Sequence, residues 1–203
     1  MKALLFANQL HGFKALSSEG AIGPVDEFYF DDISWKIRYC IIDMGTWLSD
    51  RKVLISPAAI SGLDWKNKGL VIKATKDQIQ KSPEASTELP VARVLEAQIH
   101  RHYRREFYWP EMFTAKEEVS EDKANSEHDP HLRSTKVLTD ISVISDAGED
   151  FGTIADFLID SESWQIMFAE VNQAKTGRFL LGPGLIRNID VSSRKLGIAS
   201  PWS

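Results

Sequence analysis

Two stretches of this 203-residue chain repeat each other, and the repeat limits what the chain can fold into. Gly23 to Ile37 aligns with Gly152 to Ile166 without a gap, and Gly, Phe, Asp, Ser, Trp and Ile coincide. After a turn of different length the match resumes, where Val53 to Pro57 aligns with Phe179 to Pro183. Two unrelated β-rich stretches would not keep one frame over this distance. The sequence therefore predicts an internal duplication.

Each copy is rich in β-branched and aromatic residues between Gly, Pro and Asp turns, which is typical of short strands. Between the copies, Val91, Val94, Leu95 and Ile99 fall on one helical stripe, and an acidic stretch follows from Lys116 to Pro130. We therefore expect a mainly β protein with three parts. They are a first domain over 1–82, a helical connector and acidic linker over 83–131, and a second domain over 132–203.

The repeated segments also resemble a known family. The first copy is similar to the PRC-barrel family through four consecutive segments: Ile22-Gly23-x-Val25, Phe28 to Asp32, Trp35-x-Ile37-Arg38-Tyr39, and Arg51 to Pro57. The second copy resembles it through Gly152 to Asp160 and Trp164-x-Ile166, but lacks the Arg-Tyr pair. The family includes the cytoplasmic domain of the photosynthetic reaction-centre H subunit and a ribosome maturation factor. His100 to Tyr103 and Tyr108 to Pro110 look like the connector of bacterial double-PRC-barrel proteins.

The resemblance implies two tandem small antiparallel β-barrels, each of about six strands, joined by the helix and the acidic linker. It also implies a docking or assembly role in place of catalysis. With one cysteine, Cys40, and no run of 18 apolar residues, the chain fits a reducing compartment and has no membrane span. We expect a cytoplasmic location.

The residues that carry chemistry elsewhere have simpler explanations here. Asp31, Asp32 and Asp160 could form paired carboxylates, but their place in the same turn of both copies favours turn capping. Cys40 lies mid-strand opposite Ala169 of the other copy, which favours a buried core position. Four histidines could suggest zinc, but His100 and His102 are two residues apart and diverge on a helix, and His128 and His131 have no cysteine nearby. We predict no catalytic residue, no cofactor and no metal.

Charge is divided unevenly within each copy. Six acids and two bases lie between Ser17 and Asp43, and six bases and one acid between Arg51 and Lys76. The second copy has seven acids and no base from Asp146 to Glu170, and five bases and one acid from Lys175 to Lys195. A basic strip on each domain could bind RNA. We favour pairing of oppositely charged neighbouring strands, because few aromatic residues accompany the bases.

One strand of the first copy is apolar on both sides, and we expect both sides to be covered. The inward-facing set is Phe28, Phe30, Cys40 and Ile42, and its copy is Phe157, Ile159, Ala169 and Val171. The face opposite Cys40 and Ile42 makes a candidate interaction surface: Trp35, Ile37, Tyr39 and Ile41. The Val91–Ile99 helix, the other copy or a second chain could cover this face. The matching face of the second copy ends in Glu170, which tolerates water.

Three functions remain open from the sequence. The first is a non-enzymatic protein-binding or scaffolding module, with an unknown protein partner and a possible homodimer. The second is a ribosome- or RNA-associated maturation factor, although the net charge of −5 argues against general nucleic-acid binding. The third is small-molecule binding or enzyme activity in the cleft between the two barrels.

Overall fold

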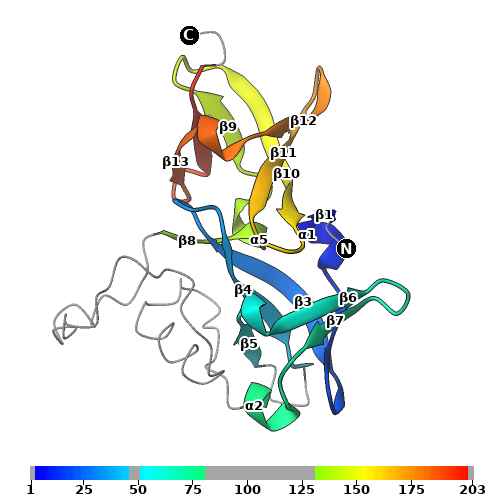
Figure 1. Ribbon diagram of the computed structural model, residues 1–203. Helices are drawn as coiled ribbons and strands as arrows, with labels where there is room; N and C mark the ends of the chain where they lie inside the picture. The colour runs from blue at the N-terminus through cyan, green and yellow to red at the C-terminus, as the bar shows by residue number, and fades with distance from the viewer. Residues whose placement is uncertain (1–2, 46–50, 81–130, 201–203) are drawn as a thin grey trace, which may run out of the picture. The chain divides into compact units, whose positions relative to one another are not determined.

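The computed structural model describes residues 3–45, 51–80 and 131–200, and these residues form a mainly β protein with two sheets of seven strands each (Figure 1). The helical connector, the acidic linker and three of the four histidines, His100, His102 and His128, lie outside the described residues.

The two copies have the same order of elements. The first copy consists of β2 (Lys14–Ser17), β3 (Gly20–Asp31), β4 (Ile37–Asp43), β5 (Lys52–Ile55), η2 (Pro57–Ala59), β6 (Ile60–Asp64) and β7 (Gly69–Ile72). The second copy consists of β9 (Ser142–Ser145), β10 (Asp150–Asp160), β11 (Ile166–Gln173), β12 (Gly177–Leu181), η3 (Pro183–Leu185), β13 (Ile186–Asp190) and β14 (Lys195–Ile198). In the first copy, α2 (Lys76–Gln80) follows β7 and contacts β5.

The strands pair in the same way in both copies. The order is β5-β4-β3-β2-β7-β6 in one sheet and β12-β11-β10-β9-β14-β13 in the other. The registers also agree residue by residue, because Ile41 faces Leu54 in the first copy and Glu170 faces Leu180 at the same place in the second. The two copies therefore share one topology, as the repeat predicts.

The seventh strand of each sheet comes from the segment that precedes the other copy. β1 (Leu4–Phe6) pairs antiparallel with β10, with Leu5 opposite Ile159, and β8 (Leu132–Ser134) pairs with β3. A four-residue helix follows each of these strands: α1 (Ala7–Leu10) after β1, and α5 (Thr135–Leu138) after β8. The two copies thus exchange their leading strands.

Because of this exchange, the compact unit that contains the second copy also contains segments of the first copy. One unit combines Met1–His11 and Glu27–Arg38 with Arg133–Ser203, and the other combines Gly12–Asp26 with Tyr39–Leu132. The turn between β3 and β4 therefore belongs to the same unit as the whole second copy.

The core of the first unit contains aromatic rings from both copies. The ring centroid of Phe30 lies 5.2 Å from that of Trp35 and 5.6 Å from that of Phe157. The ring centroid of Phe28 lies 6.1 Å from that of Trp164. These are offset, tilted contacts of the kind that stabilises aromatic cores. All five side chains are buried.

Trp35 and Trp164 occupy equivalent positions, as predicted from the repeat. Both have a left-handed backbone, with φ of 58° and 56°, and each donates its N–H to the carbonyl of the aspartate four residues earlier. Ile37 N–H donates to the Trp164 carbonyl and Ile166 N–H to the Trp35 carbonyl, both at 2.8 Å. A bulky residue with positive φ is strained, so the reciprocal hydrogen bonds and the aromatic packing hold both turns in place.

Candidate protein-docking face

The four residues of the candidate interaction surface are all buried. The backbones of Trp35 and Ile37 hydrogen-bond to Ile166 and Trp164 of the second copy, within one compact unit, and the Trp35 ring packs on Phe30 of its own copy. Tyr39 and Ile41 are completely buried. An outside protein would reach this face only if its cover moved away. The predicted inward set is also buried: Phe28, Phe30, Cys40 and Ile42, with Phe157, Ile159, Ala169 and Val171 in the second copy.

The equivalent face of the second copy is open. Leu180 is 47% exposed and Leu185 is 45% exposed, whereas their counterparts Leu54 and Ala59 are completely buried. Phe168, the counterpart of Tyr39, is only partly buried. We define the open face as Phe168, Glu170, Leu180 and Leu185.

The pairing of β11 with β12 places these side chains together. Glu170 faces Leu180 directly across the ladder, and Phe168 lies on the same side of β11 two residues earlier. Leu185 belongs to η3, which contacts β11. Gly182 precedes η3 and lies next to the Phe168 ring, because a Cβ built on Gly182 would be 4.0 Å from it. The result is a partly exposed apolar patch.

An ion pair borders the open face. The Arg178 guanidinium lies 3.0 Å from the Glu170 carboxylate, and the Glu170 side chain is largely buried while that of Arg178 is exposed. In the first copy Lys52, the counterpart of Arg178, pairs instead with Asp26 at 2.7 Å. In both copies a base of the basic stretch therefore pairs with an acid of the acidic stretch. Only Arg178 and Glu170 lie on neighbouring strands, since β4 lies between the strands of Lys52 and Asp26.

The sequence did not single out Leu180 or Leu185, because Phe179 to Leu181 reads like the buried Val53 to Ile55. One signal was present. The pair Ile41 and Ala59 becomes Glu170 and Leu185 in the second copy, which replaces a buried apolar residue by a charge and a small residue by a large one.

The repeated aspartates cap their turns. Asp31 accepts hydrogen bonds from the N–H groups of Ile33 and Ser34 and from the Ser34 hydroxyl. Asp160 accepts from the N–H groups of Glu162 and Ser163, both at 2.9 Å. Asp32 instead forms an ion pair with Arg133 at 2.6 Å. These contacts explain the aspartates as structural residues.

A buried carboxylate, Asp156, supports the exchanged segment. It accepts hydrogen bonds from the Phe157 N–H at 2.7 Å and from the Asn8 N–H of α1 at 3.3 Å. Burial raises the pKa of Asp156, and the nearby Glu170 adds to the increase. Its counterpart in the first copy, Glu27, accepts from the Ser134 hydroxyl at the start of α5. Each carboxylate thus holds the short helix that precedes the other copy.

Cys40 is completely buried, and burial raises the pKa of its thiol well above the usual range. The thiolate is the reactive form of cysteine, so this environment suppresses reactivity. Cys40 faces Ile55 in the ladder. Its role is that of a small core residue.

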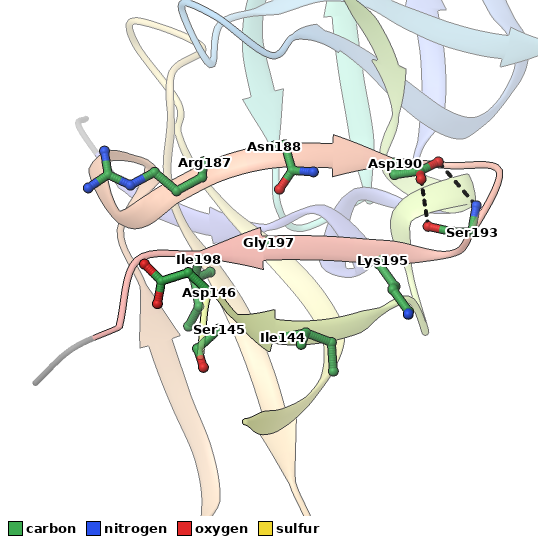
Figure 2. A pocket seen from close by; sticks show the side chains of 10 residues that line it. All are labelled: Ile144, Ser145, Asp146, Arg187, Asn188, Asp190, Ser193, Lys195, Gly197 and Ile198. Carbon is green, nitrogen blue, oxygen red and sulfur yellow. Dashed lines mark hydrogen bonds between the residues drawn. The ribbon is translucent and has the colours of Figure 1, made fainter. Parts of the chain in front are cut away.

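A shallow depression of about 280 Å³ lies on β9, β13 and β14 (Figure 2). It is lined by Ile144, Ser145, Asp146, Arg187, Asn188, Asp190, Ser193, Lys195, Gly197 and Ile198. Asp190 accepts hydrogen bonds from the Ser192 hydroxyl and from the hydroxyl and N–H of Ser193, and these bonds hold the pKa of Asp190 well below its usual range. Arg187 and Lys195 lie at opposite ends in Figure 2, so the two cations do not converge on one ligand.

Comparison with known proteins adds no relative: no protein-family model matches the chain, and neither does any curated protein. Within the described ranges, no helix has the length and apolar character needed to cross a membrane. His131, the one histidine of the four that is described, lies in no group of potential metal ligands among these residues.

Proposed function

We propose that the chain is a non-enzymatic, cytoplasmic protein-binding or scaffolding module made of two PRC-barrel-like domains. The observation that carries this proposal is the open face of the second copy. The same position in the first copy is completely buried, so the fold can cover this face but leaves it exposed in one copy. Exposed apolar patches bordered by charges are typical of protein-binding sites.

The resemblance to the PRC-barrel family supports the proposal, since that family is known chiefly for docking and assembly. The shared topology of the two sheets is compatible with two small barrels. The contacts of Asp31, Asp160 and Cys40 explain these residues structurally, so they offer no argument for an enzyme.

The RNA-associated alternative rests on the basic stretches. Two of their bases, Lys52 and Arg178, form ion pairs within the chain. Lys66, Lys68 and Arg187 are exposed, and they remain available to a phosphate backbone. The two functions therefore need an experiment that separates them.

Affinity capture from the host lysate, with quantitative mass spectrometry, tests the protein-binding function. We expect the tagged wild type to enrich a small set of proteins, and Leu180→Glu to lose them because a carboxylate would have to be buried in the contact. Val191→Glu is the matched control, since Val191 is an exposed apolar residue in the turn after β13. Ribonuclease treatment should leave the captured set unchanged.

Two results would argue against the proposal. Equal capture by Leu180→Glu and wild type would remove the open face from the function. Loss of the captured proteins after ribonuclease treatment would favour the RNA-associated alternative.

A further inference from the structure

Among the residues that the structure describes, strand β12 ends its sheet and has one edge without a partner strand. Five consecutive residue pairs, from Gln173 opposite Gly177 to Ala169 opposite Leu181, join β12 to β11. Within the described ranges, no other strand pairs with β12, and residues 177–181 make no backbone hydrogen bond outside this ladder. Since antiparallel strands direct alternate N–H and C=O groups to opposite sides, β12 directs a set of them away from β11.

β12 lacks two of the usual devices that protect an edge strand, a proline and a bulge, and its one charged residue is Arg178. Such edges are commonly blocked by proline, by a bulge or by charged side chains. The ladder of β11 with β12 has no register shift, and Phe179 to Leu181 contains neither a proline nor a charge. β10, by contrast, has a register shift in each of its ladders with β9 and β11. A regular and partly apolar edge is a template for another strand.

We propose that β12 pairs antiparallel with β12 of a second molecule of this chain, so that the β12-containing sheets of the two molecules become continuous. This inference rests on the proposed function, because it names the partner that occupies the open face. Two identical edges related by a twofold axis perpendicular to the sheet meet in the antiparallel sense. The same axis keeps Leu180 of both copies on one side of the joined sheet, beside Phe168 of each copy.

The charges on this edge allow the β12 strands of two molecules to approach each other. Arg178 is the only charged residue of β12, and its guanidinium already lies 3.0 Å from the Glu170 carboxylate. Each copy therefore brings its own counter-charge, and the pairing does not place two uncompensated cations together. Edge strand β5 of the first copy is different, because Val53, Leu54 and Ile55 are completely buried. The second repeat of each chain, through β12, therefore supplies the contact between the two molecules.

Light scattering coupled to size exclusion, with loading from about 5 to about 500 μM, tests the inference, because a contact of one short strand gives a small and concentration-dependent interface. We expect the wild-type mass to double across this range. Leu180→Glu should stay monomeric with an unchanged circular dichroism spectrum, and Val191→Glu should behave as the wild type. A wild type that stays monomeric throughout, or a Leu180→Glu variant that dimerises equally, would overturn the inference.

Hydrogen exchange of the wild type gives a second readout that needs no variant. Amides of β12 should exchange more slowly as concentration rises, while those of β13 should not change, because only β12 gains hydrogen bonds. Unchanged β12 exchange in a dimer would place the contact elsewhere and reject the strand pairing. If the wild type is monomeric but capture still depends on Leu180, the inference fails and the protein-binding function stands. If capture does not depend on Leu180 and the dimer forms, a second molecule of this chain is the only occupant of this face.

Discussion

Replacing Phe28 by alanine should lower the free energy of unfolding by about 3–5 kcal/mol, the range for truncating a buried phenylalanine. Phe28 is almost completely buried, and its ring lies 6.1 Å from that of Trp164 in the other copy. The substitution therefore removes apolar burial and also one of the contacts by which the two copies share a core. Urea denaturation followed by far-ultraviolet circular dichroism measures the loss.

Ile33→Ala is the matched control, because Ile33 lies in the following turn and is 69% exposed. Surface substitutions of this kind usually change stability by less than about 0.5 kcal/mol. A loss below about 1 kcal/mol for Phe28→Ala would mean that Phe28 does not belong to the inner face, since buried phenylalanines cost more.

Gly152→Ala should be destabilising by about 2–5 kcal/mol, because it combines backbone strain with steric overlap. Gly152 has a φ of +103°, and an added Cβ would clash with the backbone carbonyl of Asn172 on the neighbouring strand. Gly23 is its counterpart, and an added Cβ there would clash with the carbonyl of Asp43. The repeat conserves glycine between the copies because two backbones approach each other closely at this point.

Gly148→Ala separates strain from overlap. Gly148 has a φ of +83°, but an added Cβ would have no other atom within 4 Å. This variant should therefore lose only about 1–2 kcal/mol, the cost of a left-handed backbone for a residue with a side chain. Equal losses for the two variants, measured by thermal or urea denaturation, would contradict the close approach at Gly152.

The repeat made much of the fold predictable. Matching frames at Gly23 to Ile37 and Val53 to Pro57 imply matching strands, and the registers of β4 with β5 and of β11 with β12 agree residue by residue. Alternation along the strands also identified the buried set around Phe28 and Cys40. These features depend on local spacing, which a sequence displays directly.

The exchange of β1 and β8 was not predictable in the same way. Leu4 to Phe6 has the composition of a strand, but composition does not show which copy the strand joins. Pairing between distant segments depends on the whole fold, and a strand can satisfy its backbone groups in either copy. The sequence therefore does not show that Met1–His11 and Glu27–Arg38 join Arg133–Ser203 in one compact unit.

The candidate docking face of the structure lies in the second copy, whereas the one predicted from the sequence lies in the first, for a related reason. The sequence identified an apolar face at Trp35, Ile37, Tyr39 and Ile41, and it shows a glutamate at the end of the equivalent face. In the structure the first face is buried and the second is exposed at Leu180. Hydrophobicity indicates that a face needs cover, but tertiary packing decides whether it has any.

Cysteine labelling at two equivalent positions tests most directly whether the face is covered in the first copy and open in the second. Leu54→Cys and Leu180→Cys place a thiol at the same register of β5 and β12, and the native Cys40 is buried and serves as the unreactive background. Labelling with a maleimide is followed by mass spectrometry, at a concentration where the chain is monomeric. We predict that the thiol at 180 reacts at the rate of an exposed cysteine. The thiol at 54 should react at least about 100-fold more slowly, because it is reached only through local opening. Equal rates at the two positions would contradict the account.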